Sequence, residues 1–318
     1  MQLSSKSTPS FVQALMLIAP FFLWGTAMVA MKGVIPQTTP FFMAGVRLLP
    51  AGILVLLVSV ILKLPQPKTW QAWLWILAFA VVDGTMFQGF LALGIVRTGA
   101  GLGSVMIDSQ PLAVALLSSF LFGEVIGLWG WLGLFDNGEW LMLLASLSMA
   151  LGTVMISFVS RHADPVVATG WHMIIGGVPL FTLSYLQESQ QWQHISLEGW
   201  LGLGYATVFG SAIAYGIFFY LASKGNLTSL SALTFLTPIF ALLFGTIILS
   251  EVLSGLQSVG VGLTLVSIYL INQRDNLAAR FSQQTNSLET SSAVKEQAKI
   301  TINKVATTIT EEVAVEEN

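Results

Sequence analysis

The sequence predicts an all-α polytopic membrane protein that is built from two repeats. Three observations support this fold class. Of the 318 residues 54% are hydrophobic and only 9% are charged, long apolar runs recur along the chain, and the pattern of the first half returns in the second. Soluble domains carry about 25% charged residues, so the composition excludes an ordinary soluble domain. The sequence contains no cysteine, which excludes disulfides, thiolate metal sites and cysteine nucleophiles.

The repeat is clearest between residues 97–124 and 224–251, which superpose at an offset of 127 positions. A cation, a serine, a proline and a glutamate recur in register: Arg97 and Lys224, Ser104 and Ser231, Pro111 and Pro238, Glu124 and Glu251. Each apolar run of about 22 residues can cross a ~30 Å hydrocarbon layer. Both prolines are therefore expected near mid-membrane, as helix breaks that free the carbonyls of Ile107 and Thr234. Paired broken helices at matching places point to the binding site of a transporter.

Nine apolar runs are long enough to be transmembrane spans. They cover residues 11–31, 38–62, 70–93, 101–122, 139–159, 166–186, 199–222, 227–249 and 255–272. The first four recur as spans six to nine of a ten-span plan, whose fifth span is reduced to a short apolar piece at 125–135. The predicted organisation is a first repeat at 11–135 with a truncated fifth span, a second repeat at 138–272, and a disordered cytoplasmic tail at 273–318.

Positive charges test the number of crossings, because they gather on the cytoplasmic side. With an inside N-terminus and ten crossings, the cytoplasmic set is Lys6, Lys63, Lys68, Arg161, Lys224 and Arg274, against Lys32 and Arg97 outside. Nine crossings would move Arg161, Lys224 and Arg274 outside and reverse the bias. The charges therefore favour a ten-span ancestor, and whether residues 125–135 cross the bilayer is left open. The expected location is the inner (plasma) membrane of a prokaryote or an equivalent organelle membrane.

With these residues laid out, the chain resembles the EamA-type members of the drug/metabolite transporter superfamily. The resemblance is carried by FLWGTAMVAMKGV in the first span, by AGVRLLPAG in the second, and by a Gln-Pro or Thr-Pro followed 13 residues after the proline by Glu in each half. It covers about residues 11–272 and implies two inverted-topology repeats of five helices around a central cavity. That cavity would alternate access for a small metabolite, often for export. The truncated fifth span departs from this pattern.

Ionisable side chains inside membrane spans are costly and are therefore functional candidates. Four stand within the predicted spans: Asp83, Asp108, Arg47 and His172. In the functional interpretation, Asp83 or Asp108 takes a coupling proton or a cationic group. Arg47 and His172 then bind a carboxylate or tune the protonation of the acids. In the structural alternative, Arg47 extends to the interface and pairs statically with one Asp.

Polar and aromatic side chains near the predicted breaks are further candidates for substrate binding: Thr26, Gln88, Ser109, Gln110, Thr234, Thr237, Trp24, Trp171 and Tyr215. Each polar one is alternatively an interhelical hydrogen bond worth ~1 kcal/mol, and each aromatic one an interfacial anchor. Glu124 and Glu251 stand at helix ends, where we expect them to be structural, either as caps or as topology-fixing partners of nearby cations.

The leading functional hypothesis is a secondary carrier that is not an enzyme and is driven by protons or by exchange. Its expected partners are a small-molecule metabolite and the lipid bilayer, without nucleic acid, cofactor or metal, and a homodimer is left open. One alternative is a defective or structural membrane protein that lacks one helix. The other is an intramembrane serine hydrolase that uses Ser104 and His172, which is disfavoured because Ser104 has a twin, Ser231, without a second histidine at hand.

Overall fold

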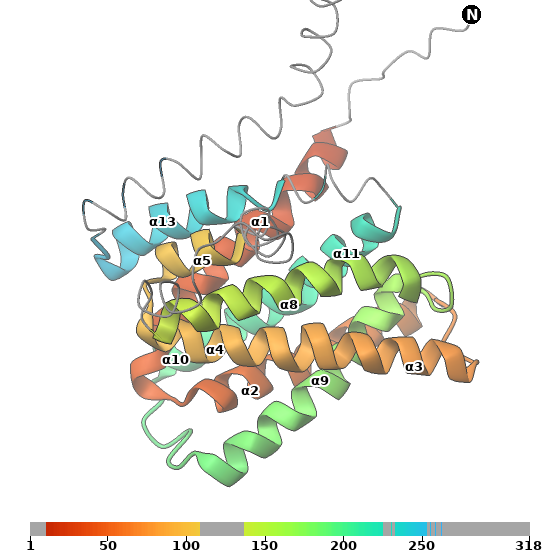
Figure 1. The fold of residues 1–318 in the computed structure, drawn as a ribbon, viewed down its shortest axis with the longest axis horizontal. Helices are drawn as coiled ribbons and strands as arrows, with labels where there is room; N and C mark the ends of the chain where they lie inside the picture. The colour runs from red at the N-terminus through yellow and green to blue at the C-terminus, as the bar shows by residue number, and fades with distance from the viewer. Residues whose placement is uncertain are drawn as a thin grey trace, which may run out of the picture. The chain divides into compact units, whose positions relative to one another are not determined.

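The computed structural model describes residues 11–108, 137–224 and 233–252, with isolated positions at 230, 255, 258 and 262, and all its described elements are helices (Figure 1). Within these residues, six helices are long and apolar enough to cross a membrane: Leu15–Gln37, Pro40–Ile61, Trp70–Arg97, Trp140–Val159, Pro165–Gln187 and Leu197–Lys224. They coincide with six of the predicted spans and confirm the all-helical membrane class. The predicted span at 255–272 and the tail lie outside the described residues.

The first half contains α1 (Phe11–Val34), the 3₁₀ turn η1 (Ile35–Gln37), α2 (Pro40–Ile61), a third span in three parts, and α5 (Ala100–Asp108). The three parts are α3 (Trp70–Phe79), the π-helical segment η2 (Ala80–Phe87) and α4 (Gln88–Arg97). Pro40 stands in the first turn of α2, where its missing N–H costs nothing. Thr69 caps α3 by accepting a hydrogen bond from the N–H of Ala72 (3.3 Å).

The second half repeats this order. It contains α8 (Asn137–Val159), α9 (Pro165–Gln187), α10 (Leu197–Tyr205), the π-helical segment η3 (Ala206–Ile213), α11 (Ala214–Lys224) and α13 (Leu236–Leu249). Asp164 caps α9 through the N–H groups of Val166 (2.9 Å) and Val167 (3.3 Å). The spans Trp70–Arg97 and Leu197–Lys224 are both 28 residues long. Each carries its π-helical segment at nearly the same place.

The equivalent helices α2 and α9 pack against each other more extensively than any other pair of described elements. Small residues permit this approach. A Cβ added at Gly52 would lie 2.7 Å from the carbonyl oxygen of Gly170 on α9. The segment η2 also packs on α9, where a Cβ at Gly84 would lie 2.8 Å from the carbonyl oxygen of His172. The two halves are therefore in contact along the helices that carry the predicted site residues.

The helix ends fall into two groups, which we call the Lys32 end and the Lys63 end. Hydrogen bonds join segments at the Lys32 end. Among them, Lys32 Nζ donates to Ile95 O (2.8 Å), Thr38 Oγ1 to Gln191 O (2.7 Å), Ser196 N to Gln37 Oε1 (2.9 Å) and Ala100 N to Glu251 Oε1 (2.7 Å). At the Lys63 end, Trp171 Nε1 donates to Gln66 Oε1 (3.1 Å) and Phe158 stacks on Trp75 (5.4 Å between ring centroids).

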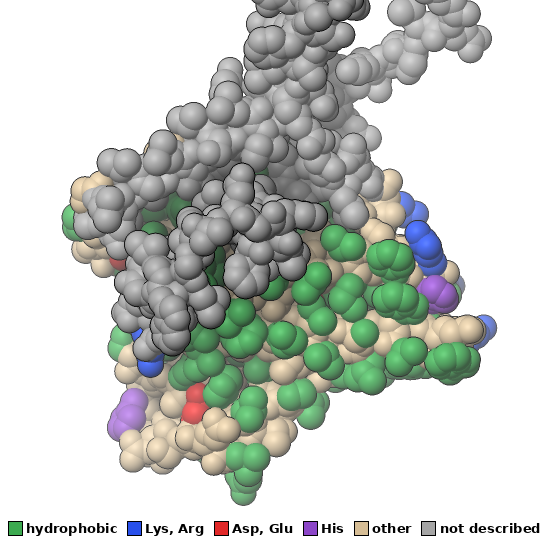
Figure 2. All heavy atoms as spheres, viewed as in Figure 1, with side chains coloured by type: hydrophobic (Ala, Val, Ile, Leu, Met, Phe, Trp, Pro, Cys, Tyr) green, Lys and Arg blue, Asp and Glu red, His purple; other side chains and the backbone are tan. Residues whose placement is uncertain are grey.

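This grouping bears on the positive charges. The helix α8 begins at the Lys32 end, because a Cβ at Gly138 would lie 2.6 Å from Cβ of Arg97, and it ends beside Trp75 at the Lys63 end. Arg161 and Lys224 therefore lie at the same end as Lys63. Among the described residues, Lys32 and Arg97 thus gather at one end and Lys63, Arg161 and Lys224 at the other. On the described part of the face in Figure 2, hydrophobic side chains are spread widely over the surface, as a bilayer requires.

Candidate functional site

A chain of polar side chains crosses the interior of the bundle. Arg47 on α2 is only 3% exposed. Its Nη1 donates to Oγ of Ser211 on η3 (3.1 Å), and its Nη2 donates to Oε1 of Gln88 on α4. Gln88 Nε2 in turn donates to the hydroxyl of Tyr215 on α11 (2.7 Å). Four elements from both halves are thus joined by three side-chain hydrogen bonds.

Two of these residues are related by the repeat. Gln88 and Tyr215 are 127 positions apart, which is the repeat offset, and they bond to each other. Residues that a pseudo-two-fold axis relates meet only when they lie close to that axis. The Gln88–Tyr215 bond therefore lies where the two halves meet. Arg47 and His172 are also equivalents, at an offset of 125.

His172 forms another buried polar contact between the halves. Its Nε2 lies 3.1 Å from Oδ2 of Asp83, and both side chains are buried. The imidazole packs on Phe79 (4.2 Å between ring centroids) and on Phe219 (5.7 Å). The α8 backbone closes over the carboxylate, since a Cβ at Gly152 would lie 2.6 Å from Asp83 Oδ1. In the described part of the chain, no other carboxylate lies within 4.0 Å of a basic side chain.

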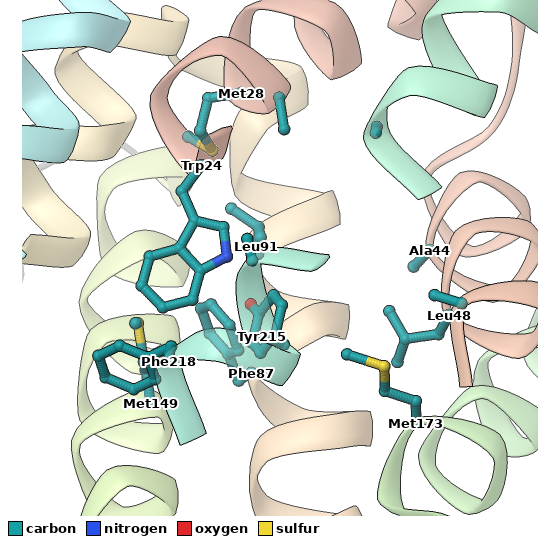
Figure 3. Close-up of a cluster of buried hydrophobic side chains, with 14 of the residues drawn as sticks. Trp24, Met28, Ala44, Leu48, Phe87, Leu91, Met149, Met173, Tyr215 and Phe218 are labelled. Carbon is teal, nitrogen blue, oxygen red and sulfur yellow. The ribbon is translucent and has the colours of Figure 1, made fainter. Parts of the chain in front are cut away.

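A small cavity adjoins Arg47 in the bundle centre. Its lining is mostly apolar and comes from both halves: Trp24, Ala27, Met28, Met31, Arg47, Phe87, Leu91, Ser104, Ile107, Met149, Gly210, Tyr215 and Thr237. About 40 Å³ of it is open to water, which holds two or three water molecules. Figure 3 shows the Trp24 indole among Tyr215, Phe218 and Met149. The ring centroids of Trp24 and Tyr215 are 5.0 Å apart. The described state is therefore contracted around its centre.

Several buried polar atoms have no hydrogen-bond partner among the described residues. Three belong to side chains that line the cavity: Trp24 Nε1, Arg47 Nε and Thr237 Oγ1. Two others belong to the buried pair, Asp83 Oδ1 and His172 Nδ1. Native proteins leave few buried polar groups unsatisfied, and each one calls for an explanation such as a functional role, a bound water or a bound ion. The unsatisfied groups thus gather at the cavity and at the Asp83–His172 pair.

The structure brings most of the predicted site residues together. Arg47, Trp24, Tyr215 and Thr237 line the cavity. Gln88 bonds to Arg47 and Tyr215, and Asp83 pairs with His172. The structural alternative for Arg47, in which it extends to the interface, is wrong because the side chain is buried. Tyr215 is buried too, rather than an interfacial anchor.

Other predicted site residues lie elsewhere. Thr26 shares a hydrogen bond with the Tyr205 hydroxyl (2.7 Å) in a separate crevice between α1, α10 and α13. Thr234 is buried just before α13. The side chain of Asp108 lies outside the described residues, as do Gln110 and Pro111 entirely.

The helix is interrupted beside Pro238, since Leu230 and Leu233 are helical, Thr234 and Phe235 form a turn, and a new helix follows. Only the predicted freeing of the Thr234 carbonyl needs a correction. The helix α13 begins at Leu236, so Pro238 stands in its first turn, where a missing N–H is tolerated. The carbonyl of Thr234 is not freed, because the N–H of Thr237 donates to it (2.9 Å). The carbonyl of Ile107, which the sequence predicts to need a partner, accepts a hydrogen bond from the Ser146 hydroxyl (2.7 Å).

The hydrogen-bond partner of Arg47 on η3, Ser211, was missed from the sequence. Hydroxyl residues are common in membrane helices, so this position did not stand out. The expected cap at Glu251 is confirmed, because its carboxylate accepts hydrogen bonds from the N–H groups of Ala100 (2.7 Å) and Gly101 (3.2 Å) at the start of α5. Its twin Glu124 lies outside the described residues.

Comparisons with known proteins agree with this architecture. The chain is 63% identical to the uncharacterized transporter sll0355 of Synechocystis, over 87% of this chain and 94% of that protein. It is 51% identical to the chloroplastic WAT1-related protein At3g02690 of Arabidopsis thaliana, over 83% of this chain and 70% of that protein. A solved crystal structure superposes with a TM-score of 0.60 at 15% identity, over 84% of this chain and 97% of that one, and supports the fold alone.

This chain is shorter than the Synechocystis relative within the region that they share. The match runs over 312 aligned positions but covers 87% of this chain, about 277 residues, so about 35 aligned positions have no residue here. The model of the EamA-like transporter family matches residues 12–135 and again residues 136–273. Two adjacent matches cover most of the sequence. The chain therefore belongs to the EamA-like transporter family.

Proposed function

We propose that this protein is a secondary carrier that exports a small metabolite by alternating access between its two repeats, driven by the proton gradient or by exchange. Membership of the transporter family supports the general class, and the relatives in Synechocystis and Bacillus subtilis are named as transporters. The observation that carries the finer proposal is the buried Asp83–His172 pair, which bridges the two halves close to the central cavity.

The pair is suited to couple a proton to a conformational change. Asp83 lies on η2 of the first half and His172 on α9 of the second. Protonation of the carboxylate removes its charge and weakens its attraction to the imidazole. Because the pair joins the halves, a proton on Asp83 favours the state in which they separate. A ligand or proton that binds one conformational state better shifts the population toward that state.

The contracted cavity supports alternating access. About 40 Å³ is too small for a metabolite, since binding sites for small molecules usually measure ~300–1,000 Å³. Substrate binding therefore requires the surrounding helices to move apart. Two hydrogen bonds cross between the halves at this place, from Arg47 to Ser211 and from Gln88 to Tyr215. We propose that they break when the cavity opens.

The residues that this chain lacks relative to the Synechocystis transporter also bear on the organisation of its first repeat. A helix that spans the bilayer needs ~20 residues, and about 35 aligned positions have no residue in this chain. This supports the proposal that the first repeat, residues 11–135, lacks most of its fifth span, beside a second repeat at 138–272. A defective carrier is the alternative, and a transport assay distinguishes the two.

Transport into proteoliposomes tests the carrier directly. We expect at least one member of a panel of radiolabelled amino acids, organic acids, amines and nucleosides to accumulate faster than in protein-free liposomes when a pH gradient is imposed. In Asp83→Asn the dependence on the gradient is lost, while exchange of internal for external substrate persists. The control is Asp164→Asn at the Lys63 end, which changes the same group and keeps a good helix cap. Parental pH dependence in Asp83→Asn would remove the pair from the mechanism, and no transport of any panel member would favour the defective protein.

A further inference from the structure

We propose that the central cavity binds an amphipathic organic anion, with a carboxylate or a similar oxyanion held by Arg47 and an apolar or aromatic body held by the remaining walls. The proposal names the substrate class of the carrier described above and rests on that function only in taking this cavity as the substrate site. Three features of the cavity support it: the charge of Arg47, the hydrogen-bond donors that lack a partner among the described residues, and the apolar walls.

The first feature is the charge of Arg47. A guanidinium stays charged in proteins, and this one is 3% exposed inside a membrane span. Its two bonded acceptors are neutral, Ser211 Oγ and Gln88 Oε1. Among the described residues, no carboxylate lies within 4.0 Å of it. A buried charge without a counter-ion is strongly unfavourable, so a bound anion would remove a cost that the described residues leave in place.

The second feature is the set of hydrogen-bond donors in the cavity wall, which matches the acceptors of a carboxylate. Trp24 Nε1 and Arg47 Nε can only donate, and the Thr237 hydroxyl can donate as well. All three are buried, line the cavity and have no partner among the described residues. An ionised carboxylate accepts hydrogen bonds and donates none. An ammonium group offers only donors and is repelled by Arg47, so an amine is the wrong ligand for these walls.

The third feature is the apolar part of the cavity wall. Seven lining residues have no polar side-chain atom that hydrogen-bonds strongly: Ala27, Met28, Met31, Phe87, Leu91, Ile107 and Met149. Three of them are methionines, whose unbranched side chains adapt to ligands of different shape. A fully polar anion would leave this surface unmatched. An apolar or aromatic body attached to the carboxylate fills it when the cavity widens.

The equivalent position in the other half does not offer a second anion site. His172 already faces the carboxylate of Asp83 at 3.1 Å, and an added anion would be repelled by it. Asp108 is the other acid predicted within a span, and its side chain lies outside the described residues. The experiment therefore includes Asp108, so that a static Arg47–Asp108 pair is detected if it exists.

Four probes separate the requirements on the purified full-length protein in lipid nanodiscs. They are 3-phenylpropanoate, its neutral amide, 3-phenylpropylamine and acetate, each titrated by calorimetry and by thermal unfolding. We expect saturable binding and a raised melting temperature with 3-phenylpropanoate. The amide and the amine bind at least about tenfold more weakly, because a hydrogen bond to a charged group is worth that much. Acetate is also weaker, because it lacks the apolar body.

Three variants assign the site. Arg47→Gln reduces the affinity for 3-phenylpropanoate by at least about 100-fold. Without ligand it melts at the parental temperature or higher, because an uncompensated charge has been removed. Trp24→Phe keeps the ring, removes one donor and weakens binding about tenfold. Arg161→Gln changes a cation that lies beside Phe158 at the helix end, away from the cavity, and retains parental affinity.

Two results overturn the proposal. One is a binding pattern that does not depend on the carboxylate: the amide or the amine binds as tightly as the acid, or none of the four probes binds. The other is an Arg47→Gln protein that melts far lower than the parent and recovers when Asp108→Asn is added, which identifies Arg47 as a static partner of Asp108. The carrier proposal can fail separately. Anion binding without transport would contradict the carrier and still support the anion site. Transport of a neutral or cationic substrate that depends on the pH gradient would support the carrier and contradict the anion site.

Discussion

Arg47 on α2 and His172 on α9 occupy equivalent places in the two repeats, but their partners differ. Each side chain crosses to the π-helical segment of the opposite half, Arg47 to Ser211 on η3 and His172 to Asp83 on η2. One meets a hydroxyl and the other a carboxylate. The same backbone arrangement thus forms two kinds of site: one basic group has its counter-ion within the protein, and the other has none among the described residues.

This difference suggests a division of labour in the proposed carrier. The Asp83–His172 pair is complete in itself and exchanges a proton, whereas Arg47 is completed by the substrate anion. Both sites bridge the same two halves. Two ligands that bias one conformational equilibrium are coupled thermodynamically, without any contact between them. The proton and the anion would therefore influence each other through the approach of the halves.

The largest expected effect comes from making the two sites alike. Ser211→Asp places a carboxylate opposite Arg47, whose Nη1 lies 3.1 Å from Ser211 Oγ. The new side chain neutralises the guanidinium and competes with the substrate. We expect the affinity for 3-phenylpropanoate to fall by more than about 100-fold, ~3 kcal/mol, as measured by calorimetry. Ser211→Asn, which has the same size without the charge, should lose much less, and equal losses in the two variants would refute the charge argument.

The next prediction disturbs the complete site. A Cβ at Gly152 would lie 2.6 Å from Asp83 Oδ1, so Gly152→Ala pushes the carboxylate away from His172. Overpacking of this kind costs ~1–3 kcal/mol of stability, and we expect the pH dependence of transport to weaken with it. Gly204→Ala is the matched control, because its Cβ would meet nothing within 4 Å. The control should unfold at the parental temperature or slightly higher, since alanine favours a helix by up to ~1 kcal/mol over glycine.

The smallest expected effect tests the contact between the halves. Tyr215→Phe removes the hydroxyl that accepts a hydrogen bond from Gln88 (2.7 Å), at a cost of ~1 kcal/mol. If this bond holds the cavity contracted, its loss favours opening and raises the apparent affinity for the anion by a few-fold. Tyr205→Phe removes the comparable bond to Thr26 outside the cavity (2.7 Å). It should destabilise the protein to a similar extent without changing the affinity, and identical affinities in both variants would contradict a gating role.

The sequence predicted those features that leave local signals. Six spans follow from the lengths of apolar runs, and the importance of Arg47, Asp83 and His172 follows from the cost of charge in a membrane. The offset of 127 also relates Gln88 to Tyr215, so their contact was within reach of the repeat pattern. The pairing of Arg47 with Ser211 and of His172 with Asp83 could not be predicted, because it depends on which helices meet in space.

Two other features were also beyond the sequence. The π-helical segments η2 and η3 depend on packing against neighbouring helices and have no distinct composition. Pro238 is predicted to free the carbonyl of Thr234, but a helix that begins at Leu236 makes Pro238 a residue of the first turn, and the N–H of Thr237 bonds to that carbonyl. In both cases the local sequence allows two structures, and the tertiary contacts select between them.

The central claim is that the two equivalent basic residues serve different ligands, and an experimental structure with a brominated anion tests it most directly. Crystals grown with 3-(4-bromophenyl)propanoate would locate the bromine by its anomalous scattering. The account predicts one bromine among the apolar residues of the central cavity, with the carboxylate within hydrogen-bonding distance of Arg47 and Trp24 and the Asp83–His172 contact intact. A carboxylate bound at His172 in place of Asp83, or a bromine only in the crevice beside Thr26, would contradict it.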